Sequence, residues 1–105
     1  RTYLFAKNCR GLIFKLPKTI SNIEDGKQLV RSSGSVAANY IEANEKLGDK
    51  DFKFRLKISR KEAKESILWL KLLKDLNIKF ETELIQLLNE AEELRKILSA
   101  IINKS

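Results

Sequence analysis

An apolar heptad repeat in the last quarter of the chain limits how this protein can fold more than any other sequence feature. Six apolar residues form two series with a spacing of seven: Leu84, Ala91 and Leu98, and Leu87, Leu94 and Ile101. Two apolar positions in every heptad are typical of a helix that packs along its length against near-parallel neighbours. The repeat predicts a helix over about residues 81–103, in a helical bundle or a coiled coil.

Three other segments also have helical periodicity, and together they favour a bundle over a freestanding coiled coil. Apolar residues recur on one helical face in segments at about 2–16, 21–47 and 49–76. The links between the segments are short, which favours antiparallel packing of consecutive helices. The sequence therefore predicts one all-α domain over residues 1–105, an antiparallel up-down-up-down four-helix bundle. Because the sequence opens at Arg1 and contains no Met, we also expect the natural chain to begin earlier.

A few residues with strong local preferences predict the helix ends. Pro17 ends the first helix, since proline cannot continue the ladder of backbone hydrogen bonds. Ser21 and Glu24 have the spacing of a capping box, which predicts the start of the second helix. Gly48 is predicted to cap the C-terminus of that helix. Gly34, in its middle, lowers helix propensity and predicts a closely packed neighbour.

Composition narrows the chemistry that is available. The chain has 105 residues, no His and one Cys, which excludes most His-based catalysis, zinc cages and disulfide frameworks. Cys9 shares a helix face with apolar residues, so we expect a small buried side chain. No apolar run approaches the ~20 residues that span a bilayer. We therefore expect a cytoplasmic protein that is not an enzyme and has no cofactor, metal, membrane partner or small-molecule substrate.

Paired glutamates raise the question of a metal centre. Glu62 and Glu65 lie three residues apart on the third predicted helix, and Glu42 and Glu45 have the same spacing on the second. Four-helix bundles do build di-metal sites from glutamates, but those sites also use Glu-x-x-His motifs. Without His, we interpret these carboxylates as members of salt bridges.

A polar stripe crosses the second predicted helix and has a counterpart on the third. It consists of Arg31, Ser35, Asn39 and Glu42 on the second helix, with Lys61, Glu62 and Glu65 at comparable depth on the third. The stripe is either a solvated helix face or a polar network between helices or between subunits. Since buried charges must be paired or they cost several kcal/mol, such a network would fix helix register rather than add much stability.

Basic residues are concentrated at the junction of the second and third predicted helices. The chain contains 21 Lys and Arg against 14 Asp and Glu, a net charge of +7. Five of the basic residues lie at this junction: Lys46, Lys50, Lys53, Arg55 and Lys57. Phe52 and Phe54 lie between them, and basic residues interleaved with aromatics can bind phosphates and stack on bases. The alternative is the start of a helix with its apolar residues inward and its lysines in solvent.

Five segments, in order and at consistent spacing, carry a resemblance to one family. They are LPKT (16–19), QLVRSSGSVAANYIEA (28–43), KDF (50–52), KISRKEAKESILWLKLL (57–73) and NEAEELRKIL (89–98). In these segments the chain resembles the bacterial four-helix-bundle proteins first met as products of intervening sequences inside 23S rRNA genes, which are often labelled ribosomal proteins. The likeness spans nearly the whole chain. It departs from the family at Leu68, where the family often has Tyr before the Trp.

The resemblance implies a fold, an assembly and a partner. Family members are up-down four-helix bundles that assemble into rings, typically pentamers, with a role in nucleic-acid binding and no known catalysis. A related group of bundle proteins assists the reverse transcriptase of diversity-generating retroelements, also as a basic pentameric ring. By this resemblance, eight residues are expected to act in helix packing or subunit docking: Arg31, Ser35, Asn39, Glu42, Lys61, Glu62, Glu65 and Trp69.

Charge and resemblance lead to the same functional expectation. We expect a basic homo-oligomer, a pentameric ring by resemblance, that binds structured RNA or DNA. The residues expected to contact the nucleic acid are Lys46, Lys50, Lys53, Arg55 and Lys57. A ring multiplies the positive charge and attracts phosphate backbones through counterion release. The alternative is a protein-interaction scaffold, for example an accessory factor of a nucleic-acid enzyme such as a reverse transcriptase.

Overall fold

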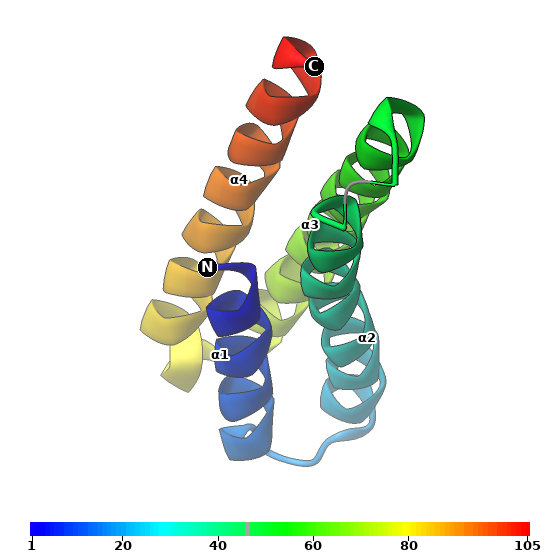
Figure 1. Ribbon diagram of the computed structural model, residues 1–105. Coiled ribbons are helices and arrows are strands. Elements are labelled where there is room, and N and C mark those ends of the chain that lie inside the picture. Colours follow the sequence, from blue (N-terminus) through cyan, green and yellow to red (C-terminus); the bar gives the residue numbers. More distant parts are fainter. Residues whose placement is uncertain (46) are drawn as a thin grey trace.

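The computed structural model describes residues 1–45 and 47–105, and the regular structure in these residues is helical. The helices are α1 (Thr2–Lys15), α2 (Ile20–Ala43), α3 (Asp49–Leu76) and α4 (Glu81–Lys104), with a short 3-10 helix, η1 (Ile78–Phe80), before α4. None of the helices in these two ranges has the length and apolarity needed to cross a membrane. Consecutive helices are antiparallel, and α1 also packs against α4 (Figure 1). The predicted four-helix bundle is confirmed.

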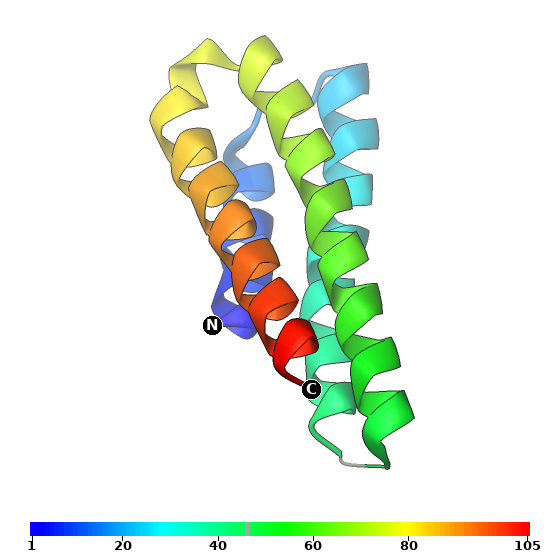
Figure 2. The same ribbon diagram turned by 90° about the horizontal axis from the view of Figure 1, so that it is seen from above.

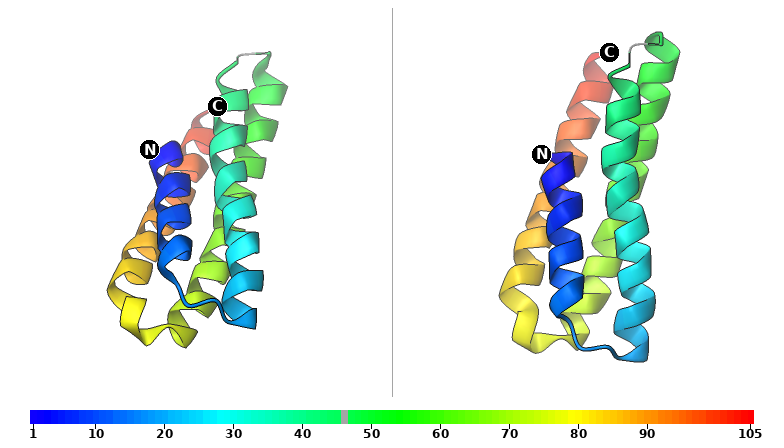
Figure 3. Two further views of the ribbon diagram at one scale, coloured as in Figure 1. Left: turned by 90° about the horizontal axis from the view of Figure 1, so that it is seen from below. Right: turned by 60° about the horizontal axis from the view of Figure 1, so that its bottom comes forward.

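Helix α1 covers only part of the length of the bundle. The bundle measures 44 × 19 × 18 Å, and α1 has 14 residues, whereas α2 and α4 have 24 each and α3 has 28. The N-terminus lies beside the middle of α4, whereas the C-terminus lies near the end where α3 begins (Figure 2 and Figure 3). One half of the bundle therefore contains four helices, and the half with the start of α3 contains three.

The apolar core is divided in the same way. The four-helix half holds the larger cluster of buried side chains: Phe5, Cys9, Leu12, Leu16, Leu29, Ile67, Leu70, Leu73, Leu84, Leu87, Ala91 and Leu94. The three-helix half holds a smaller cluster: Ala43, Leu56, Leu98 and Ile102. Five of the six heptad residues belong to these sets, and the sixth, Ile101, packs against the smaller cluster. The heptad repeat therefore marks the core face of α4, as predicted.

The start of α2 differs from the prediction. Thr19 has extended backbone angles, and its side chain accepts a hydrogen bond from the backbone N–H of Asn22 at 3.1 Å. Thr19 is therefore the N-terminal cap, and the helix begins at Ile20. The predicted capping box of Ser21 and Glu24 is wrong, because both residues already lie inside the helix. Thr and Ser are both good caps, and the position goes to the last residue that keeps a non-helical backbone.

The end of α2 also differs from the prediction. The helix ends at Ala43, and the backbone N–H of Asn44 bonds to carbonyl oxygens in the last turn. Gly48 is not this cap. It lies directly before α3 with a φ of +131°, a left-handed angle that glycine adopts without strain, and its carbonyl oxygen accepts the N–H of Phe52 at 2.9 Å. A glycine in a short link can either end the helix before it or precede the first turn of the helix after it. Gly48 precedes the first turn of α3.

Gly34 has a close neighbour, as predicted, and this neighbour is the end of the Arg10 side chain from α1. The guanidinium of Arg10 lies over it and donates hydrogen bonds to the carbonyl oxygens of Ala6 (3.1 Å) and Val30 (3.2 Å), one in each helix. A Cβ atom at position 34 would lie 3.1 Å from Nη2 of Arg10, which is a crowded contact. The absence of a Cβ at position 34 leaves room for this guanidinium, while glycine lowers helix propensity by about 1 kcal/mol relative to alanine.

A buried amide pair, which the sequence analysis missed, ties the end of α3 to α2. Asn22 and Asn77 each donate from Nδ2 to the other's Oδ1 at 2.8 Å. They also donate to the carbonyl oxygens of Pro17 (2.9 Å) and Leu73 (2.8 Å), respectively. Both side chains are buried. Because a buried polar group is costly when it lacks a partner, this pair fixes the two links of the bundle relative to each other.

Candidate nucleic-acid interface

One arginine joins α2 to α3. Nη1 of Arg31 lies 3.3 Å from Oε1 of Glu62, and its Nη2 lies 2.7 Å from Oε1 of Glu65. The Glu62 side chain is only 9% exposed, whereas that of Arg31 is 48% exposed. The three residues therefore form an ion-pair cluster between two helices of one chain.

The other residues of the predicted polar stripe do not join this cluster. Asn39 Nδ2 donates to the carbonyl oxygen of Ser35, 2.9 Å away in the same helix. Glu42 and Lys61 are exposed, and neither forms an ion pair within residues 1–45 and 47–105. Trp69 is half-buried against the larger apolar cluster. The stripe is therefore divided between a helix–helix ion-pair cluster and a solvated face.

Buried serines hold α2 and α3 together beside this cluster. The Oγ atoms of Ser32 and Ser66 lie 2.8 Å apart, and Ser59 Oγ donates to the carbonyl oxygen of Val36 at 2.8 Å. All three serines are fully buried. Small side chains let the two helix backbones approach closely, so the serines in this part of α2 act in packing.

Cys9 is a buried thiol in the larger apolar cluster, as predicted. Burial raises its pKa to about 12, and this effect outweighs the opposing influence of Ser33 and Arg10. Since only the thiolate is a good nucleophile, Cys9 is protonated and unreactive near neutral pH in the folded protein.

The predicted basic segment brings three of its lysines together. Lys50, Lys53 and Lys57 are spaced by three and four residues, so they share the outward face of α3. Lys46 lies outside the described residues. The side chain of Arg55 lies on a different face of the helix, because it follows Lys53 by two residues. Three of the five predicted contact residues therefore form one surface.

The remaining residues of the segment face elsewhere. The guanidinium of Arg55 lies 3.6 Å from the carboxylate of Asp51 and 5.9 Å from the ring centre of Phe54. Phe52 packs against the smaller apolar cluster, whereas Phe54 is 58% exposed. Arg55 is therefore partly neutralised, and only one of the two phenylalanines is accessible to a partner.

Three further lysines, which the sequence analysis did not assign to the interface, extend the outward face along α3. The complete set, the lysine row, is Lys50, Lys53, Lys57, Lys61, Lys64 and Lys71. Four of these lysines recur every seven residues, at positions 50, 57, 64 and 71, which places them about 10.5 Å apart along the helix. This lysine heptad is the sequence signal that would have identified the row. Within the described residues, none of the six lysines forms an ion pair.

No carboxylate of α3 interrupts the lysine row. Glu62 and Glu65 form ion pairs with Arg31 of α2. Asp51 lies 3.6 Å from Arg55, on another face of α3. Asp49 precedes the row and Asp75 follows it. The row is therefore a positive surface on α3 without an intervening carboxylate, although the exposed Leu68 lies between Lys64 and Lys71 on the same face. It is the strongest candidate site for a polyanion.

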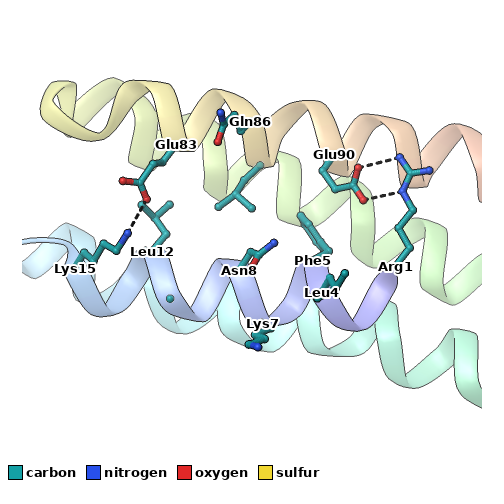
Figure 4. Close-up of a pocket in the computed structure, with 12 residues that line it drawn as sticks. Arg1, Leu4, Phe5, Lys7, Asn8, Leu12, Lys15, Glu83, Gln86 and Glu90 are labelled. Atoms are coloured by element: carbon teal, nitrogen blue, oxygen red, sulfur yellow. Dashed lines mark hydrogen bonds and ion pairs between the residues drawn. The ribbon is translucent and has the colours of Figure 1, made fainter.

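A groove between α1 and α4 is bracketed by two ion pairs (Figure 4). Arg1 donates two hydrogen bonds of 2.9 Å to Glu90, and Lys15 Nζ lies 3.2 Å from Glu83. The hydrogen bonds from Arg1 hold the pKa of Glu90 below its usual range. Because these charges cancel in pairs and Lys7 points away from α4, the groove offers less attraction to phosphate than the lysine row does.

Comparisons with known proteins agree with this fold. The family model for "23S rRNA-intervening sequence protein" matches residues 1–100. Among solved structures, the chain is similar to the crystal structure of a protein of unknown function from the S23 ribosomal protein family of Bacteroides thetaiotaomicron. The TM-score is 0.83 and the sequence identity 28%, over 96% of this chain and 94% of that chain. No curated protein gives a significant sequence match. The sequence match and the structural match point to one family.

Proposed function

Because the chain belongs to the 23S rRNA-intervening sequence protein family, we propose that it is a non-enzymatic, basic oligomer that binds structured RNA or DNA through the outward face of α3. The observation that carries this proposal is the lysine row, six lysines on one helix face with no carboxylate among them. The net charge of +7 supports the same kind of partner. The proposal includes a cytoplasmic setting, in which the single thiol stays reduced.

Electrostatics would supply most of the affinity for a nucleic acid. Each lysine that contacts a phosphate releases condensed counterions, so the logarithm of the binding constant falls by roughly 0.9 per contact for each tenfold rise in salt. Six contacts would weaken binding by about 10³-fold between roughly 50 and 200 mM salt. Steep salt dependence is therefore the signature of this mechanism.

A homo-oligomer, with five subunits as the typical number in the family, is the second part of the proposal. Large apolar side chains are exposed on the other three helices: Tyr3, Leu4, Phe14, Ile20, Ile23, Ile41, Ile85 and Ile97. Exposed apolar side chains mark an interface where they form a contiguous patch. A ring assembled through these faces would leave the lysine rows free and repeat them around the particle.

The alternative function, a protein-interaction scaffold, is favoured by one group of apolar residues. Phe14 (89% exposed), Ile20 (85%) and Ile78 (79%) lie where α1 leads into α2 and α3 into α4. This is the end of the bundle opposite Lys50. A protein partner that bound there would be insensitive to charge changes on α3.

Charge reversal at the start of the lysine row is expected to weaken nucleic-acid binding strongly. The variant Lys50→Glu, Lys53→Glu, Lys57→Glu removes three phosphate contacts and adds three repulsive charges. We expect a loss of more than about tenfold in affinity and a salt slope that falls by about 3. Fluorescence anisotropy with labelled structured RNA and duplex DNA at several salt concentrations measures both quantities.

A matched variant separates this surface from net charge alone. Lys7→Glu, Lys18→Glu, Lys27→Glu makes the same change of charge at exposed positions on α1, α2 and their link. Equal losses in both variants would contradict the assignment of the α3 surface. If the unmodified protein binds neither ligand near physiological salt, the proposed function is wrong and protein partners become the next target. Circular dichroism confirms that each variant is folded.

Light scattering at micromolar concentration tests the assembly. We expect a mass of about 60 kDa, five times the 12.1 kDa of one chain, because rings of identical subunits close on themselves. A mass of about 12 kDa, that of a single chain, would remove the ring from the proposal. Dilution of the sample towards nanomolar concentration then shows how tightly the subunits associate.

A further inference from the structure

We infer that the lysine row binds a double helix, of RNA or DNA, along about one helical turn and through its phosphates alone. This inference rests on the nucleic-acid binding proposed above. Lys50 and Lys71 are 21 residues apart, which corresponds to about 32 Å along α3. One turn of B-form DNA is about 34 Å long. The length of the row therefore matches one turn.

The straightness of the row favours a double helix over a single strand. The heptad lysines are held about 10.5 Å apart on a continuous helix of 28 residues. The two grooves of a duplex alternate along its axis, so a rod laid along that axis crosses both phosphate backbones within one turn. Charges at fixed positions then meet phosphates at fixed positions. A flexible single strand would have to be ordered to meet the same charges, and this ordering opposes binding.

The row also lacks the groups that read or stack on bases. Lysine ammoniums are compact charges without the planar fork by which arginine recognises guanine. The two arginines of α3 are engaged elsewhere, since Arg55 lies near Asp51 and Arg60 Nη1 donates to Ser99 Oγ at 3.3 Å. In the described part of α3, Phe54 is the one exposed aromatic beside the row, whereas single-strand binders stack successive bases on several aromatics. Contact with the phosphates alone makes binding independent of sequence.

Fluorescence anisotropy with hairpins of different length tests the inference. The probes are RNA and DNA hairpins with stems of about 6 or about 12 base pairs, shorter and longer than one turn, and unstructured strands of the same total length. We expect the longer stems to bind at least about tenfold more tightly than the shorter stems and the single strands, because only they meet the whole row. The comparison of RNA with DNA stems shows whether A-form or B-form geometry fits the row better.

A double charge reversal in the centre of the row shows whether the row itself makes the contact. Lys57→Glu with Lys64→Glu should weaken binding of the longer stems at least about tenfold and lower the salt slope by about 2. Lys7→Glu with Lys18→Glu makes the same change of charge on α1 and the link after it. We expect that control to weaken binding by a few-fold at most.

The outcomes separate this inference from the proposed function. Equal binding of stems and single strands, both weakened by the row variant, overturns the duplex inference and leaves nucleic-acid binding intact. Tight stem binding that the row variant does not weaken also overturns the duplex inference, because the contact then lies elsewhere. If the row variant loses the oligomeric mass of the unmodified protein, the row is a contact between copies and the inference is wrong. Absence of binding to every probe removes the proposed function as well.

Discussion

Replacement of Leu70 by alanine is expected to lower the free energy of unfolding by about 3 kcal/mol. Leu70 is fully buried in the larger apolar cluster, where α3 faces the other helices. The substitution removes most of the side chain and leaves a cavity that the surrounding helices can fill only in part. For a domain of this size, the loss corresponds to a fall in Tm of roughly 10–20 °C. Thermal unfolding followed by circular dichroism measures it.

Leu68→Ala provides the matched control on the same helix. Leu68 lies two residues away and is 49% exposed, so the same chemical change creates no enclosed cavity there. We expect its effect to stay within about 0.5 kcal/mol, as is usual for surface substitutions. A loss at position 68 as large as that at position 70 would show that the outward face of α3 is covered in the native protein.

The second large effect is expected at the ion-pair cluster between α2 and α3. Arg31→Met keeps much of the apolar stem but removes the guanidinium that lies 3.3 Å from Glu62 and 2.7 Å from Glu65. The nearly buried Glu62 carboxylate then has no counter-charge. Breaking a buried pair costs about 3–5 kcal/mol, and the half-exposed position of Arg31 reduces this to about 2 kcal/mol. Equilibrium unfolding in urea measures the change.

A double-mutant cycle distinguishes a lost counter-charge from lost packing. In the Arg31→Met background, Glu62→Gln replaces the carboxylate with a neutral amide of the same shape. We expect this second change to recover at least half of the lost stability, because an amide needs no counter-charge. If the two substitutions are instead additive within about 0.3 kcal/mol, the two side chains are not coupled and the cluster does not hold the helices in register.

The fold was predictable because its core pattern is local and repeated. The heptad repeat alone predicts which face of α4 is buried, without any long-range information. Its members Leu84, Leu87 and Leu94 are all buried in the larger cluster. The helix ends were harder to predict, because the competing signals are of similar strength. Thr19 and Ser21 are both good caps, and a left-handed glycine such as Gly48 suits the end of one helix or the start of the next.

The candidate site was predictable only where helix phase was considered. Arg55 was grouped with Lys53 and Lys57 by proximity in sequence, but a spacing of two residues turns its side chain to another face, near Asp51. Sequence spacing shows which residues share a face and not which faces meet. For this reason, the partners of Arg31 could be placed in one chain only from the structure.

Long-range polar pairs leave no trace in local patterns. Asn22 and Asn77 are 55 residues apart, and each taken alone is an ordinary residue for a helix end or a link. Their reciprocal hydrogen bonds form only when the two links of the bundle come together. Such pairs therefore cannot be predicted from periodicity or composition.

The short first helix gives the two ends of the molecule unequal local stability. Of the described residues, twelve form the buried cluster beside α1, and four form the cluster beyond its N-terminus. Opening the second end separates fewer buried apolar residues, so we expect local opening of the described residues to cost less free energy in that half of the bundle. The lysine row begins at that end, with Lys50, and runs to Lys71 on the better-packed half. A stiff polyanion docked along α3 would thus lie across both halves of the bundle, with Lys71 on the half that has the larger buried cluster and Lys50 on the half that has the smaller one.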